Sequence, residues 1–210
     1  MDILNPILVL APHTDDGEIG CGASIAKFIE DGHEVFYVAF SSARRSVPKG
    51  FPDNILETEV RKATKILGIP PKNLILFDYE VRTFPADRQN ILENMIQLKK
   101  DLNPGLVLCP SQEDIHQDHQ TIYQEALRAF KCHSILAYEQ PWNNIVFRTR
   151  CFIRITKEHL QKKLEALGCY ESQKHRGYLT EDAVTGLART RGAQIEGDLA
   201  EAFEVIRWML

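Results

Sequence analysis

The chain has 210 residues, of which 44% are hydrophobic and 26% charged, and its formal net charge at pH 7 is −4. This composition is typical of a globular protein rather than a disordered or fibrous one, and the length suits a single domain over residues 1–210. The negative net charge and the lack of a long block of basic residues argue against a nucleic-acid binder, which needs a clustered positive face. A small-molecule substrate is therefore the first expectation.

The five cysteines are odd in number, widely spaced and without a C-x-x-C pair. In a secreted protein that number would leave a thiol unpaired. The chain opens without a basic and apolar leader, and no apolar run approaches the length of a membrane span. We therefore expect a cytoplasmic protein with reduced cysteines and no membrane contact.

Short apolar runs alternate with amphipathic stretches along most of the chain. Length, β-branched content and apolar spacing predict a strand at 7–12, a helix at 17–31, a strand at 35–40, a helix at 55–67, a strand at 74–77, a helix at 87–101, a strand at 106–110, a helix at 119–131 and a strand at 135–138. This alternation predicts an α/β fold: an open, mostly parallel sheet in three layers, with right-handed crossovers.

Beyond residue 141 the pattern is less regular. Residues 151–155 predict one more strand, with an edge position and antiparallel pairing as options. Helices are expected over 157–173 and 181–190, whereas residues 201–208 fit either a strand or a helical turn.

The first predicted strand ends in a polar cluster, Pro12-His13-Thr14-Asp15-Asp16-Gly17-Glu18. Ligands of open α/β sheets bind at the carboxyl ends of the strands. The turn allows His13 and Asp16 to point at a common centre while Asp15 faces a neighbouring direction, which favours a metal site. The alternative is that Asp15 or Asp16 caps the following helix, because Asp is a preferred N-cap residue.

A second cluster, His116-Gln117-Asp118-His119, follows the fourth predicted strand. Two histidines and an aspartate so close together beyond a strand are hard to explain by packing. If strands one and four are neighbours in the sheet, His119 can aim a ring nitrogen at the same centre as His13 and Asp16. Three protein ligands with one position left for water are typical of a catalytic zinc site.

The remaining polar residues suit the chemistry of such a site. A zinc ion lowers the pKa of its water to about 7, and Asp15 is the candidate base for the proton of that water. His116 is the candidate for stabilising the oxyanion or protonating a leaving amine, with Asp118 orienting it by a carboxylate–imidazole hydrogen bond. These residues predict a zinc-dependent amidohydrolase, with Fe(II) as a second option for the metal.

At these residues the sequence resembles the LmbE-like, or PIG-L, deacetylase family. The first motif of that family, Ala-His-Pro-Asp-Asp-Glu, is similar to residues 12–17, and its second, His-x-Asp-His, is similar to residues 116–119. Looser similarity extends to residue 203, so the resemblance spans nearly the whole chain. It implies a Rossmann-like three-layer fold and the removal of an N-acetyl group from an amino-sugar-containing metabolite.

The resemblance also implies a role for each residue of the two motifs. His13, Asp16 and His119 are the implied metal ligands, Asp15 the implied general base and His116 the implied acid or oxyanion partner. Members of the family often form trimers or hexamers, so a homo-oligomer is a further expectation.

The sequence departs from the family at two positions of the first motif. Thr14 stands where Pro is usual, and Gly17 where Glu is usual, with Glu18 one place later. Substrate contacts are marked only weakly. Arg82 is a candidate sugar contact, with a solvated loop position as the alternative. Trp142, beyond the fifth strand, is a candidate wall on which a sugar ring stacks, with a packed aromatic as the alternative.

Two other functions are compatible with the sequence. One is hydrolysis of a different amide or an ester by the same metal chemistry. The other is a metal-free sugar-nucleotide-binding module on the same scaffold. That module would need closely spaced glycines to cradle phosphate at the first strand–helix turn, where Asp15 and Asp16 would repel it.

Overall fold

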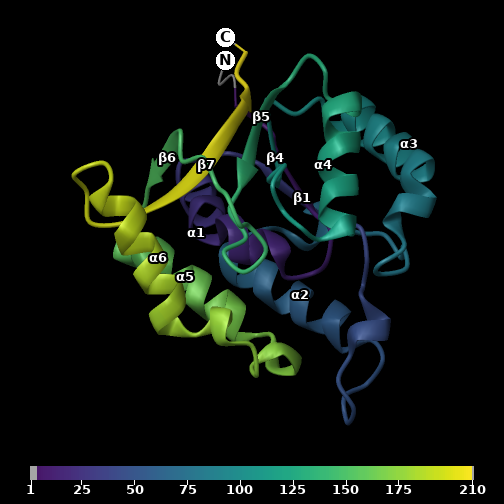
Figure 1. Cartoon of the computed structure of the whole chain (residues 1–210), viewed down its shortest axis with the longest axis horizontal. Coiled ribbons are helices and arrows are strands. Elements are labelled where there is room, and N and C mark those ends of the chain that lie inside the picture. The colour runs from purple at the N-terminus through teal and green to yellow at the C-terminus, as the bar shows by residue number, and fades with distance from the viewer. Residues whose placement is uncertain (1–3, 210) are drawn as a thin grey trace.

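A computed structural model describes residues 4–209 of the chain (Figure 1). A seven-stranded sheet in the order β3-β2-β1-β4-β5-β7-β6 forms its centre. The five consecutively parallel strands are β1 (Ile7–Ala11), β2 (Val35–Ala39), β3 (Leu74–Leu76), β4 (Leu106–Pro110) and β5 (Ser134–Tyr138). β7 (Ala200–Arg207) pairs antiparallel with both β5 and β6 (Cys151–Arg154). The predicted, mostly parallel α/β architecture is confirmed.

The strand order places the two motifs side by side. β1 pairs with β2 through Ile7↔Val35 and with β4 through Ile7↔Leu106, so the sheet is extended in both directions from β1. This is a topological switch point, where ligands bind in open α/β sheets. The expectation that the first and fourth strands are neighbours is confirmed, and both strands end at the same edge.

Helices cover both faces of the sheet, giving three layers. One face packs against α1 (Asp16–Glu30), α2 (Ile55–Leu67) and α5 (Lys157–Gly168), and the other packs against α3 (Phe84–Leu102) and α4 (Gln117–Ala129). α6 (Glu181–Ala193) packs beside α5 and β7 (Figure 1). Side chains of β1 alternate between the two cores, as the two-residue period of a strand requires. Within residues 4–209, every helix is too short or too polar to cross a membrane.

The structure differs from the predicted elements mainly in the last third. The helix expected over 157–173 ends at Gly168 and is followed by a short 3₁₀ turn, Glu171–Gln173. Residues 200–207 form a strand, because β5 and β6 supply hydrogen-bond partners on its two sides. β6 lies at the edge of the sheet and pairs antiparallel, which confirms that option.

Candidate metal centre

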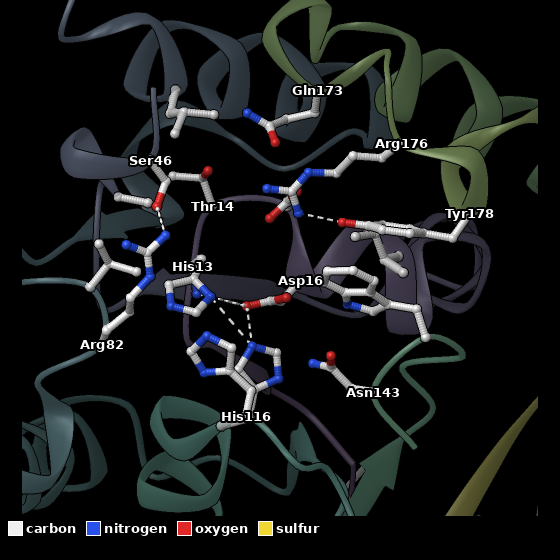
Figure 2. A pocket seen from close by; sticks show the side chains of 17 residues that line it. His13, Thr14, Asp16, Ser46, Arg82, His116, Asn143, Gln173, Arg176 and Tyr178 are labelled. Carbon is white, nitrogen blue, oxygen red and sulfur yellow. Dashed lines mark hydrogen bonds and ion pairs between the residues drawn. The ribbon is translucent and has the colours of Figure 1, made fainter. Parts of the chain in front are cut away.

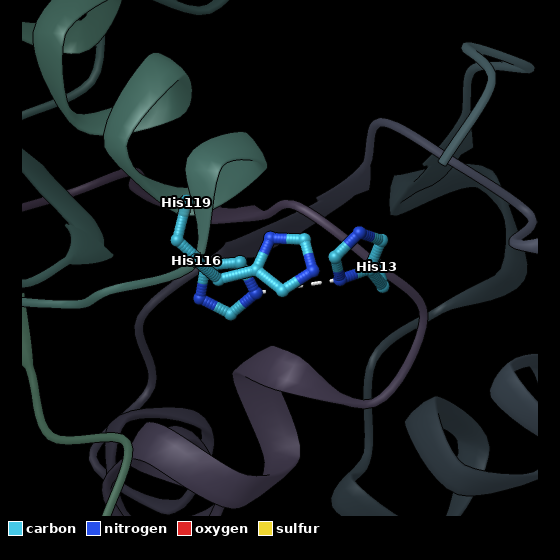
Figure 3. Close-up of side chains that lie close together, drawn as sticks. All are labelled: His13, His116 and His119. Atoms are coloured by element: carbon cyan, nitrogen blue, oxygen red, sulfur yellow. Dashed lines mark hydrogen bonds between the residues drawn. The ribbon is translucent and has the colours of Figure 1, made fainter. Parts of the chain in front are cut away.

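Three metal-ligand atoms converge where β1 and β4 end. His13 Nδ1 lies 3.1 Å from Asp16 Oδ2, His119 Nε2 lies 3.2 Å from the same oxygen, and the two ring nitrogens are 3.3 Å apart (Figures 2 and 3). A tetrahedral zinc ion with bonds of about 2.0–2.1 Å spaces its ligand atoms by roughly 3.3 Å. The triangle of His13, Asp16 and His119 therefore has the size that a small divalent cation requires.

The outer nitrogen of each of these two rings contacts a buried carboxylate. His13 Nε2 lies 3.0 Å from Asp118 Oδ2, and His119 Nδ1 lies 2.7 Å from Asp114 Oδ2. Because an ionised carboxylate only accepts hydrogen bonds, these contacts place the ring protons on the outer nitrogens. The lone pairs of His13 Nδ1 and His119 Nε2 then face Asp16. Carboxylate–imidazole pairs of this kind accompany metal-bound histidines, and three converging acceptors need a cation or a shared proton between them.

The electrostatics of the triangle favour positive charge. Burial disfavours the charged ring of His119, yet Asp16 and Asp114 raise the pKa of His119 to about 10. Burial also disfavours an ionised Asp16, but His119 and His13 hold the pKa of Asp16 well below its usual value. The protein without metal thus holds a proton strongly at the place where a divalent cation would lie.

His116 lies beside the triangle but has a different partner. One nitrogen from each of His13, His116 and His119 lies within 4.8 Å of the others, a cluster able to hold a metal ion (Figure 3). However, the backbone N–H of Asp118 donates to His116 Nδ1 at 3.1 Å, so the proton of the neutral ring is on Nε2. Burial and the neighbouring rings of His119 and His13 lower the pKa of His116, which favours that neutral form. His116 is thereby suited to donate a hydrogen bond.

The predicted hydrogen bond between the carboxylate of Asp118 and His116 is wrong. Asp118 Oδ2 lies 4.0 Å from His116 Nδ1 and 3.0 Å from His13 Nε2. The same oxygen accepts from the backbone N–H of Arg82 at 2.6 Å. His116 is the N-cap residue of α4, and its ring is occupied by the backbone of Asp118, so the side chain of Asp118 is left to face β1. Asp118 therefore orients the ring of His13.

Asp15 lies between β1 and α1, is 8% exposed and lines a cavity of about 190 Å³. It occupies the N-cap position of α1, but its side chain makes no capping hydrogen bond, so the helix-cap alternative does not account for it. Burial and the charge of Asp16 raise the pKa of Asp15, while Arg176 and His13 oppose the rise. A buried carboxyl group with raised proton affinity has the properties of a general base.

Both candidate substrate contacts line the same cavity. The ring of Trp142 is 57% exposed and lies against Tyr178, with the ring centroids 4.6 Å apart. Arg82 enters from the opposite wall, where its guanidinium contacts Ser46 Oγ at 3.4 Å (Figure 2). The cavity thus brings Arg82 and Trp142 together with the two motifs, although the sequence separates them widely.

Sequence reasoning missed several residues of the site, Tyr178 among them. Asp114 pairs with His119, Arg176 lines the cavity, and Gln140 donates to the backbone oxygen of Asp16 at 2.9 Å. The only available signal for Asp114 was an acid in the loop that precedes His119. Gln140 and Arg176 come from distant segments and belong to no motif, so only the fold places them.

The departure at Gly17, with the acid one place later at Glu18, has a packing explanation. A Cβ atom added at Gly17 would lie 2.4 Å from the ring of Tyr37. Glu18 is fully buried and hydrogen-bonded to the hydroxyl groups of Tyr37 and Tyr170. Glu18 lies in the first turn of α1, as expected for a helix-start acid, but it also ties that turn to β2 and to the segment after α5.

A comparison with known proteins shows which family this chain matches. The family model described as PIG-L, GlcNAc-PI de-N-acetylase, matches residues 8–130. The uncharacterized deacetylase YaiS of Escherichia coli K12 is 31% identical over 172 residues, which cover 79% of this chain and 90% of YaiS. The diacetylchitobiose deacetylase of Thermococcus kodakarensis is 29% identical over 123 residues, or 54% of this chain and 45% of that enzyme.

A solved structure shows that the same fold also serves another reaction. GalB, the 4-carboxy-2-hydroxymuconate hydratase of Pseudomonas putida KT2440, superposes with a TM-score of 0.80 at 21% identity and with 98% of each chain covered. At that level of identity the likeness concerns the fold alone. The reaction of this chain therefore has to be argued from its side chains and its nearer relatives.

Proposed function

Because this chain belongs to the PIG-L family of deacetylases, we propose that it is a metal-dependent hydrolase that removes an N-acetyl group from an amino-sugar-containing metabolite. The observation that carries the proposal is the triangle of His13, Asp16 and His119, with a carboxylate behind each of the two rings. The similarity to a diacetylchitobiose deacetylase supports an amino sugar as the substrate.

We assign His13, Asp16 and His119 as the metal ligands, with zinc as the first candidate and Fe(II) as the second. Two nitrogens and one carboxylate oxygen suit either ion. When bound, such an ion supplies Lewis acidity, which polarises an acyl carbonyl and lowers the pKa of a water molecule. We leave His116 out of the ligand set because its Nε2 carries the proton while its Nδ1 accepts from the backbone.

Two further residues have separate roles: Asp15 transfers the proton and His116 stabilises the negative charge. Asp15 takes a proton from the attacking water, whose oxygen forms a bond to the acyl carbon. His116 Nε2–H donates to the acyl oxygen as negative charge develops there, which is the role of an oxyanion-hole donor. Asp15 then passes its proton to the nitrogen as the carbon–nitrogen bond breaks, and the products are acetate and a free amine.

Release of both products from a panel of N-acetyl amino sugars, glycosides and sugar phosphates tests this function, with O-acetylated sugars and an unsaturated carboxylic acid included as alternative substrates. We expect acetate and amine in equal amounts, complete loss of turnover with a chelator and recovery when zinc or Fe(II) is added back. Acetate released only from O-acetylated compounds would indicate an esterase. Hydration of an unsaturated carboxylic acid, without release of acetate, would indicate a reaction of the GalB type. Either result would contradict the proposal.

A further inference from the structure

The cavity above the triangle holds a guanidinium group that forms no ion pair with a carboxylate among residues 4–209. The group belongs to Arg176, which lies between α5 and α6 and reaches into the cavity (Figure 2). The Cζ atom of Arg176 lies 5.8 Å from the ring centroids of both Trp142 and Tyr178. The guanidinium donates a hydrogen bond to the hydroxyl group of Tyr178. These aromatic contacts hold the charge in place without neutralising it.

Other arginines near carboxylates in this protein form tight ion pairs. Arg88 contacts Glu125 at 2.5 Å, and Arg191 contacts Glu139 at 2.5 Å. Within residues 4–209, by contrast, no ion pair joins Arg176 to an acid. The nearest effect of its charge is on Asp15, where it opposes the rise in the pKa of that carboxyl group. The geometry therefore leaves the donor face of Arg176 available to a molecule in the cavity.

The wall of the cavity carries two guanidinium groups, those of Arg176 and Arg82. The guanidinium of Arg82 contacts the hydroxyl group of Ser46, and the two arginine side chains enter from opposite walls (Figure 2). Guanidinium groups bind carboxylate and phosphate well because their donors match those oxygens, so an anionic group of a bound molecule is the partner that these two side chains fit.

We propose that Arg176 selects substrates whose acylated amino sugar carries an anionic group, a carboxylate or a phosphate, with Trp142 and Tyr178 forming the adjoining wall. The inference rests on the proposed deacetylase function and adds the substrate class. Arg176 is in this account a specificity-determining residue: it binds a part of the substrate that does not react. Arg82 is placed to assist from the other side of the cavity.

The test compares three probes that share one sugar. These are methyl N-acetylglucosaminide, which is neutral, N-acetylglucosamine 1-phosphate, and N-acetylmuramic acid, which carries a carboxylate. We expect kcat/KM of the wild type to be about tenfold or more higher for at least one anionic probe, because a charge-assisted hydrogen bond contributes about 1.5–3 kcal/mol. The better anionic probe identifies phosphate or carboxylate as the natural group.

The Arg176→Gln variant should lose that preference, mainly through a higher KM for the anionic probe, and Arg176→Lys should retain part of it. The ratio between anionic and neutral probes cancels any effect of Arg176 on Asp15, because that effect is common to all substrates. Arg189→Gln is the matched control, since Arg189 is exposed on α6 and outside the cavity. Thermal unfolding of each variant checks that the fold is retained.

Equal kcat/KM for neutral and anionic probes in the wild type, or an equal fall for both in Arg176→Gln, would overturn the inference and leave the deacetylase function intact. Calorimetric binding of the amine products, which are glucosamine 1-phosphate, muramic acid and methyl glucosaminide, needs no turnover. If no probe is hydrolysed, the deacetylase function fails, but this binding still decides the inference. Tighter binding of an anionic product that is lost in Arg176→Gln supports it, and binding that does not discriminate anionic from neutral products refutes it.

Discussion

His13, His116 and His119 offer nitrogens within 4.8 Å of one another, yet their rings have different partners. Two rings donate to carboxylates through their outer nitrogens and present lone pairs to the centre. The third ring accepts from a backbone N–H and presents a donor. At the scale of the residue, the hydrogen-bond partner therefore separates a metal ligand from an oxyanion donor. The sequence predicts the same separation, but it does not show the hydrogen-bond partners that produce it, because residue types and spacing do not say which acid faces which ring.

Replacement of Asp15 by Asn separates catalysis from metal binding. The amide cannot take the proton of the attacking water, so turnover should fall roughly 10²–10⁴-fold, the usual contribution of acid–base catalysis. Metal content should stay near that of the wild type, measured by plasma mass spectrometry. Asp182→Asn, at an exposed position on α6, is the control and should keep full turnover. Loss of metal together with turnover would make Asp15 a ligand.

Zinc affinity should depend on pH in a defined direction. Burial opposes a charged ring at His119, but Asp16 and Asp114 raise the pKa of His119 to about 10 in the metal-free protein. The proton is therefore bound at pH 7 and must leave when zinc binds. Apparent affinity should rise with pH by about tenfold per unit for each proton released, up to the pKa of about 10. Competition with a chelator of known pH dependence measures it, and a flat profile would mean that no proton is displaced.

At the scale of the element, α1 begins at the proposed ligand Asp16, and it is not a regular helix. Its backbone leaves helical geometry at Cys21, with φ −148° and ψ 24°. On one side of this break Lys163 Nζ donates to the carbonyl oxygen of Ile19 at 2.7 Å, and on the other Glu201 accepts from the backbone N–H of Ser24 at 2.7 Å. Lys163 and Glu201 also pair at 2.6 Å. A buried ion pair from α5 and β7 thus satisfies backbone groups on both sides of the break.

Removing one member of this ion pair should destabilise the protein strongly. Lys163→Met leaves Glu201 buried without its counter-charge, and breaking a buried pair in this way costs about 3–5 kcal/mol. Urea unfolding of the metal-loaded protein measures the free energy of unfolding. Lys162→Met, one residue earlier and exposed on the same helix, should stay within about 0.5 kcal/mol of the wild type. Similar free energies of unfolding for both variants would mean that the ion pair does not hold α1 in place.

At the scale of the whole molecule, local signals predicted the elements better than their tertiary roles. The helix at Ile55–Leu67 was predicted to the residue, because its apolar spacing is regular and Gly68, with φ +96°, ends it in the left-handed conformation. Residues 200–207 could not be assigned, because both partners of that strand are distant in sequence. Arg176 and Gln140 were missed for the same reason: their place at the site depends on how the last third of the chain folds back.

The metal content of two matched histidine variants tests the central claim most directly. Purified wild-type protein should carry close to one equivalent of zinc or iron per chain, as three ligands and one open position require. His119→Ala should lose most of that metal, because one corner of the triangle with His13 and Asp16 is gone. His116→Ala, which removes a ring from the same cluster, should keep it. Loss of metal from His116→Ala with retention in His119→Ala would contradict the assignment.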